Sequence, residues 1–264
     1  MSKDTKTINE VKTPTPGTAV MTWKEKMAMV TAQAAATEAP KGGWLSFKGG
    51  NIVYDDSNIP GNTMDVVVVD FALENAYYED KYNPAKTVPP TCYAIGRDEE
   101  SMRPHPDCES PQSPQCGIPG TDNCCPMNEW ASDPEGGRGK ACKNSRRIII
   151  MPADAIKKGT EAITKAGTLV CKIPSTSLKN FSKYVNQCVK VLEVPPFGVT
   201  TRLSTKPHPT NLFEVNWMVL DKVMGDDNME ALYNKHMSAE RTLFAPYPKK
   251  EEEQAAKAPA SKKF

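Results

Sequence analysis

The chain has 264 residues and 8 cysteines, and its 33 Lys and Arg against 32 Asp and Glu give a net charge of +1. This length suits one sizeable domain with appendages, or two small domains. No run of about eighteen apolar residues occurs, so the sequence excludes a membrane-spanning helix. The polar N-terminus lacks the apolar stretch of a signal peptide, which favours a cytoplasmic protein with reduced thiols.

The charges are unevenly distributed along the chain. Residues 51–109 carry 12 Asp and Glu against 4 Lys and Arg, whereas residues 138–206 carry 14 Lys and Arg against 3 Asp and Glu. Such asymmetry suits a protein that binds a polyanion with one face, although two separately solvated faces would give the same pattern.

The N-terminal half is predicted to contain an arm and then several strands. Residues 1–40 are expected to form a disordered arm and a helix from Thr22 to Glu38, rich in Ala, Met and Lys. The pattern from Trp44 to Tyr54 predicts two short strands around a Gly-Gly turn. The run from Met64 to Tyr78 holds four successive valines, typical of a strand buried on both faces. A further short strand is expected from Thr91.

Two more strands are predicted after the cysteine-rich region, from Arg146 and over Thr168–Ile173. The next segment, PSTSLKNFSKYVNQCVKVL, predicts an amphipathic helix capped near Ser175 or Ser177. Its expected buried face repeats every three or four residues and comprises Leu178, Phe181, Val185, Val189 and Leu192.

The rest of the chain predicts a closing β-hairpin over VTTRLST and NLFEVNWMVL, then a short helix near Asp227–Arg241 and a disordered tail within 226–264. The fold class is therefore mostly β (α+β), with one or two packed helices. A small Greek-key barrel over 41–225 fits these elements, and an open α+β sheet fits them nearly as well.

Six of the cysteines lie between Cys92 and Cys142, in a segment with little that could build an apolar core. A structural zinc ion held by four thiolates is the simplest way to stabilise it. The preferred ligands are Cys92, Cys116, Cys125 and Cys142, because the first and last lie at strand ends and Pro126 follows Cys125.

Other arrangements of these cysteines stay open. Cys108, Cys124 or His105 could replace one ligand, and free surface thiols or disulfides are further alternatives. Cys171 and Cys188 are expected to be small core residues. No serine-centred, phosphate-cradling or HExxH motif is present, so an enzyme is not expected.

The cysteine-rich segment ends in a basic run, RGKACKNSRR, which contains no acidic residue. Its cations are predicted to contact phosphates, and the predicted helix adds Lys179 and Lys183. The run supplies Arg138, Lys140, Lys143, Arg146 and Arg147.

Aromatic residues that could stack on unpaired bases lie near these charges, which favours single-stranded nucleic acid. Core packing is the competing role for such rings. The candidates are Tyr77, Tyr78, Tyr82 and Trp130.

The strings AYYEDKYNPAKTVPPTCYAIG, CPMNEWASDPEGGRGKACKNSRRIII and IPSTSLKNFSKYV make the chain similar to phage-encoded single-stranded DNA-binding proteins. The similarity covers roughly residues 44–220. It implies an oligonucleotide-binding (OB) barrel with a zinc-binding insertion at 93–147, held by the four preferred cysteines.

The resemblance also implies a role in coating single-stranded DNA during phage replication or recombination, in the cytoplasm of the infected host. Replication or recombination proteins would be partners through the termini, although the mixed-charge tail departs from the acidic tails of many such proteins. The alternative is a zinc-stabilised structural or protein-interaction module, such as a virion component or a polymerase-associated factor.

Overall fold

The computed structural model describes residues 22–24, 26, 27, 43–80 and 88–247. The chain divides after Pro40 into two units. In the first unit, Trp23, Lys24, Lys26 and Met27 are helical, and the rest of the helix predicted to Glu38 lies outside the described residues.

The second unit is mostly β and is built on one sheet that curls into a half-barrel. This confirms the prediction of a mostly β fold. The sheet has nine strands within the described residues, in the order β3-β2-β1-β7-β6-β4-β8-β9, and β5 pairs with β4. The strands are β1 (Trp44–Lys48), β2 (Asn51–Tyr54), β3 (Ser57–Asn58), β4 (Thr63–Tyr77), β5 (Cys92–Gly96), β6 (Lys143–Pro152), β7 (Leu169–Ile173), β8 (Val199–His208) and β9 (Leu212–Lys222).

The long strand β4 organises the sheet. It pairs with β6 along one edge, and along the other edge with β8 near its start and β5 near its end. The four valines from Val66 to Val69 are all buried, as predicted. Successive side chains of a strand point to opposite sides of the sheet. The burial of four consecutive valines therefore shows that both faces of β4 are covered.

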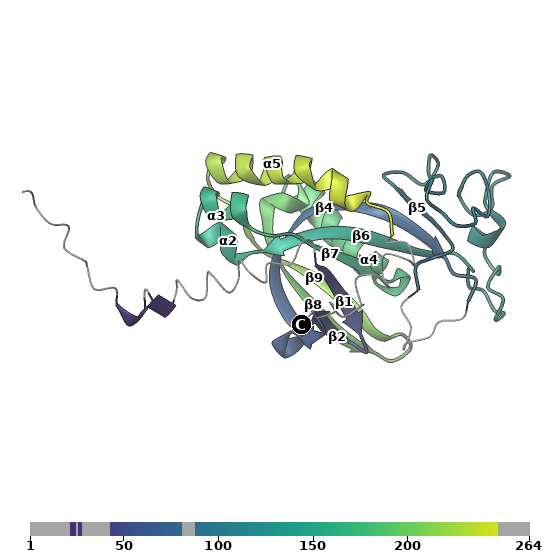
Figure 1. Cartoon of the computed structure of the whole chain (residues 1–264), viewed down its shortest axis with the longest axis horizontal. Helices are drawn as coiled ribbons and strands as arrows, with labels where there is room; N and C mark the ends of the chain where they lie inside the picture. Colours follow the sequence, from purple (N-terminus) through teal and green to yellow (C-terminus); the bar gives the residue numbers. More distant parts are fainter. Residues whose placement is uncertain (1–21, 25, 28–42, 81–87, 248–264) are drawn as a thin grey trace, which may run out of the picture. The chain divides into compact units, whose positions relative to one another are not determined.

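Helices cover the two faces of the sheet (Figure 1). On one face, Phe181 and Tyr184 of α4 (Leu178–Asn186) pack in the core cluster that contains Val66 and Ile148. On the other face, α2 (Asp154–Lys157), α3 (Thr160–Lys165) and α5 (Asp226–Leu243) pack in the cluster that contains Val67 and Ile149.

The predicted amphipathic helix is present but ends differently. A π-helical turn, Gln187–Val191, follows α4 and shifts the buried face, so that Cys188 is buried and Val189 is 52% exposed. The predicted side-chain cap at Ser175 or Ser177 is wrong. The Ser177 hydroxyl instead accepts a hydrogen bond from the Val215 backbone N–H of β9, at 2.9 Å.

Three helices cover the other face of the sheet, where the sequence predicted one short helix. The sequence interpretation missed α2 and α3, and α5 is longer than the helix expected near Asp227–Arg241. Helix α5 forms one unit with the sheet, while residues 248–264 of the predicted tail lie outside the described residues. No helix in the described part of the chain is long and apolar enough to cross a membrane.

Between β5 and β6 the chain leaves the sheet for residues 97–142, here called the excursion. Its regular structure is one 3-10 turn, Pro126–Asn128. The excursion lies within the predicted 93–147 insertion, whose ends form parts of β5 and β6.

Candidate functional site

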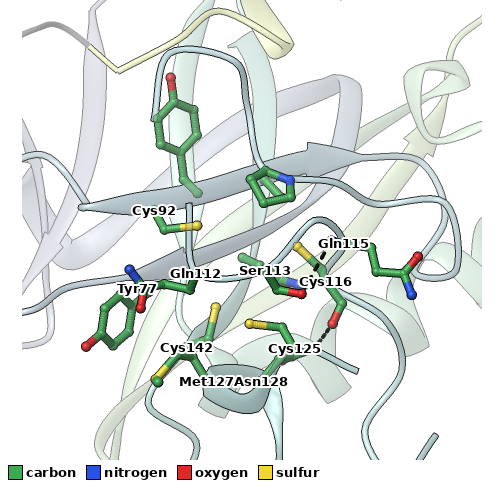
Figure 2. Close-up of a pocket in the computed structure, with 14 residues that line it drawn as sticks. Tyr77, Cys92, Gln112, Ser113, Gln115, Cys116, Cys125, Met127, Asn128 and Cys142 are labelled. Atoms are coloured by element: carbon green, nitrogen blue, oxygen red, sulfur yellow. Dashed lines mark hydrogen bonds between the residues drawn. The ribbon is translucent and has the colours of Figure 1, made fainter. Parts of the chain in front are cut away.

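Four of the excursion-region cysteines line a single pocket. Cys92 opens β5, Cys142 directly precedes β6, and Cys116 and Cys125 come from the excursion itself. Figure 2 shows their sulfur atoms pointing toward a shared space. These are the four residues that the sequence interpretation preferred as zinc ligands.

Backbone hydrogen bonds bring these segments together. The Cys116 N–H donates to the Met102 carbonyl at 2.9 Å, and the Cys125 N–H donates to the Cys116 carbonyl at 2.9 Å. The Cys142 N–H donates to the Met127 carbonyl at 2.7 Å. The pocket is therefore fixed by main-chain contacts at three of its four cysteines.

Burial raises the pKa of three of the four thiols. It raises the pKa of Cys92 to about 11 and those of Cys116 and Cys142 to about 12. These three thiols are therefore neutral near pH 7, and a metal ion would have to displace their protons.

The alternative ligands do not line the pocket, although Cys108 is a close neighbour of Cys92. The Cys108 thiol donates to the Tyr93 carbonyl at 3.1 Å, and the Cys124 thiol contacts the Cys125 carbonyl at 3.5 Å. The His105 ring stacks on Tyr93, and its Nδ1 lies 3.1 Å from the Tyr93 hydroxyl. None of these three side chains lines the pocket.

The chemistry of the donor set fits zinc, which favours four thiolates in structural sites. All eight cysteines are free. Among the residues that the structure describes, no three His, Cys, Asp or Glu side chains are already positioned to hold a metal ion. The four thiols would have to close around the ion.

The basic run beside the pocket divides into exposed and occupied cations. Arg138 is exposed, and Lys143 is exposed but paired with Asp133 at 2.6 Å. Lys140 is half-buried and donates to the Asn144 side-chain oxygen at 2.8 Å. Arg146 is half-buried on β6.

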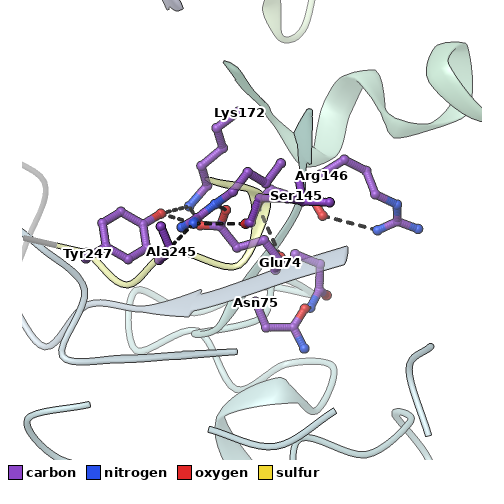
Figure 3. Close-up of polar contacts among 10 residues, drawn as sticks. Glu74, Asn75, Ser145, Arg146, Lys172, Ala245 and Tyr247 are labelled. Carbon is purple, nitrogen blue, oxygen red and sulfur yellow. Dashed lines mark hydrogen bonds and ion pairs between the residues drawn. The ribbon is translucent and has the colours of Figure 1, made fainter. Parts of the chain in front are cut away.

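Arg147 corrects the sequence interpretation. It is 1% exposed, so it cannot contact a phosphate at the surface. Its Nε donates to Glu74 at 2.9 Å, and its Nη1 donates to the Ala245 carbonyl at 2.6 Å. Figure 3 shows Lys172 and Tyr247 completing this cluster and Arg146 directed away from it.

The predicted aromatic residues occupy different environments. Trp130 is 67% exposed on the excursion, and Tyr78 is 39% exposed just after β4. Tyr77 is half-buried and lines the cysteine pocket, while Tyr82 lies outside the described residues.

Lys179 and Lys183 lie one turn apart on the exposed side of α4. They belong to an element separate from the excursion. The structure thus brings the four cysteines and the basic run together, and it leaves these two lysines on the helix that covers the sheet.

Three buried or half-buried asparagines near the pocket were missed. Asn75 on β4 and Asn144 on β6 are register partners, and Asn128 lies in the turn after Cys125. Only Asn75 had a signal in the sequence, an amide in a mostly apolar strand, since buried amides need specific partners. Asn128 and Asn144 stand among polar residues and had none.

Comparisons of the chain with protein-family models, with curated proteins and with solved structures found no match.

Proposed function

We propose that this protein binds single-stranded DNA through the excursion, which a structural zinc ion keeps folded. The ligands would be Cys92, Cys116, Cys125 and Cys142, and the curled sheet would be an OB-like barrel. The observation that carries the proposal is the meeting of these four thiols in one pocket, in the segment that presents Trp130 and Arg138 to solvent.

The need for zinc follows from the composition of the excursion. It has one short 3-10 turn within its described residues, and its buried hydrophobic cluster is small, with Met102 and Cys116 packed against Ala94 of β5. Such a segment gains little from burial, so metal binding would supply much of its folding free energy. Bound zinc would supply electrostatic attraction for the four thiolates and no reaction.

The surface favours unpaired bases over a duplex. Trp130 is highly exposed, and a base that stacks on its ring gains about 1–3 kcal/mol without any sequence code. Bases within a duplex do not offer their faces. Exposed Arg138 would bind the phosphates, with Lys143 contributing after it leaves Asp133.

The setting of this function is also a proposal. The resemblance to phage-encoded single-stranded DNA-binding proteins supports a role in phage replication or recombination, in the cytoplasm of the infected host, with partners recruited through the termini. No catalytic step is proposed.

The direct test compares two exposed tryptophans. Trp130→Ala should weaken binding of the zinc-loaded protein to fluorescent oligo-dT by about 5- to 150-fold, the equivalent of one lost base stack. Trp23→Ala, which removes an exposed tryptophan from the first unit, should leave the affinity unchanged. Equal affinities of the two variants, or no binding by the unaltered protein, would refute the proposal.

A zinc-stabilised protein-interaction module is the second candidate. Lys143 is paired and Arg147 is buried, so fewer cations are available to bind phosphates than the basic run predicted. This smaller number favours the interaction module. Gel shifts with single-stranded and duplex DNA separate the two functions, because an interaction module would shift neither.

A further inference from the structure

A polar network connects the cysteine pocket with the exposed ring of Trp130. Its centre is Asn144, whose side-chain NH₂ donates to the side-chain oxygens of Asn75 and Asn128. Asn128 is 3% exposed and Asn75 is 8% exposed, so most of the network is shielded from water. Buried polar networks of this kind hold their members in one geometry when every group is satisfied.

At the pocket end, the network contacts Cys116 from two sides. The Asn75 side chain lines the pocket next to the Cys116 thiol. The Asn128 amide donates to the carbonyl of Gly117 at 3.0 Å and to that of Cys116 at 3.5 Å. Movement of Cys116 toward a metal ion would therefore be felt by both asparagines.

At the surface end, the network holds Lys140. Its ammonium donates to the side-chain oxygen of Asn144 at 2.8 Å and to that of Asn128 at 3.5 Å. The same nitrogen lies 4.6 Å from the centre of the Trp130 ring, within the range of a cation–π contact. Lys140 thus occupies one face of Trp130 and leaves the other for a stacked base.

Electrostatics connects Lys140 to the metal. Four thiolates around a divalent zinc ion carry a net charge of about −2, which favours a nearby cation. A filled site would therefore strengthen the contacts that fix Lys140.

We propose that Asn75, Asn128, Asn144 and Lys140 couple zinc binding at the cysteine pocket to single-stranded DNA binding at Trp130. This inference rests on the proposed function and deepens it. Lys140 is then a positioning residue and not the phosphate contact expected from the basic run.

Coupling between two binding sites must be reciprocal. If zinc tightens the binding of oligo-dT by a given factor, oligo-dT tightens the binding of zinc by the same factor. A coupling of about 5- to 150-fold is typical of linked sites. Oligo-dT affinity is measured with zinc-loaded and zinc-stripped protein, and zinc affinity by competition with a chelator, with and without oligo-dT.

Two variants of the full chain separate positioning from phosphate binding. Lys140→Met and Arg138→Met each remove one positive charge from the excursion, but only Lys140 belongs to the network. We expect Lys140→Met to weaken zinc binding by about 10- to 100-fold, as for other residues that support metal ligands. Arg138→Met should leave zinc affinity unchanged and weaken only DNA binding.

The zinc measurement decides this inference separately from the proposed function. Equal zinc affinities of Lys140→Met and Arg138→Met would overturn the coupling network, even if the unaltered protein binds oligo-dT. Absence of oligo-dT binding by zinc-loaded protein would overturn the proposed function and the coupling, leaving only the support of the metal site by Lys140. If Lys140→Met does not fold, Lys140→Gln replaces it. This variant keeps a donor for the asparagine oxygens but loses the positive charge, so its zinc affinity should still fall below that of Arg138→Met.

Discussion

Neighbouring Arg146 and Arg147 illustrate how strand geometry decides the role of a side chain. Successive residues of β6 point to opposite faces, so the two guanidinium groups cannot share one surface. Arg147 donates to Glu74, to the carbonyl of Leu243 at the end of α5, and to the carbonyl of Ala245 just after the helix. It therefore ties the sheet to the C-terminal helix.

Loss of this buried pair should be costly. Arg147→Met removes the main partner of Glu74 Oε2 and leaves a fully buried carboxylate with fewer charges to balance it. We expect a loss of about 3–5 kcal/mol in the free energy of unfolding, measured by urea denaturation. Lys143→Met, which breaks the exposed pair with Asp133, should cost about 1 kcal/mol or less.

A cost for Arg147→Met no larger than that for Lys143→Met would contradict the structural role of Arg147. It would return this arginine to the set of surface cations.

The buried carboxyl of Glu74 should also make the stability of the fold depend on pH. Burial alone raises its pKa, but the charges of Lys172 and Arg147 outweigh burial and hold the pKa below the usual 4.5. A carboxyl with a lowered pKa stabilises the fold above its unfolded-state pKa, and the stabilisation is lost as pH falls through the folded-state pKa. The urea concentration at the unfolding midpoint should therefore decrease as the pH is lowered below about 4.5. Glu74→Gln should reduce this acid dependence.

At the scale of elements, the excursion depends on its metal more than the sheet does. Strands β4 and β6 are buried on both faces, while the excursion contains a single 3-10 turn among its described residues. Removal of zinc by a chelator should raise amide hydrogen exchange across residues 97–142 and leave β4 and β6 protected. Equal loss of protection in both regions would show that the excursion is not a separate folding unit.

The sequence predicted elements whose signals are local. The Gly-Gly turn between β1 and β2, the valine run of β4 and the long hairpin of β8 and β9 each follow from short patterns. The π-helical turn after α4 could not be predicted this way, because Val189 and Cys188 are both acceptable as buried residues.

The candidate site was predicted unevenly for the same reason. Cysteine is distinctive, so the four pocket residues could be selected from the sequence and their placement at strand ends. The role of Arg147 depends on Glu74, which is distant in the chain. The role of Lys140 depends on Asn144, which is near in sequence but is held by contacts with Asn75 and Asn128. A basic run does not reveal which of its cations already have partners.

At the scale of the whole molecule, the uneven charge along the chain is partly internal pairing. Asp65 binds Arg202 at 2.8 Å, and Glu74 binds both Arg147 and Lys172. In each case the acidic segment 51–109 supplies the carboxylate and the basic segment 138–206 supplies the cation. The charge available for a polyanion is therefore smaller than the composition of either segment suggests.

This pairing makes the salt dependence of binding a quantitative test. Among the predicted contacts, Arg138, Lys143, Lys179 and Lys183 are exposed. If two to four of them bind phosphates, the logarithm of the association constant should fall against the logarithm of salt concentration with a slope of about −1 to −3.

The most direct measurement is the affinity of zinc-loaded protein for fluorescent oligo-dT over a range of salt concentrations, repeated after removal of zinc. Binding should weaken with salt along this slope, and it should weaken further without zinc. Affinity that is independent of both salt and zinc, or absence of binding at low salt, would contradict this prediction.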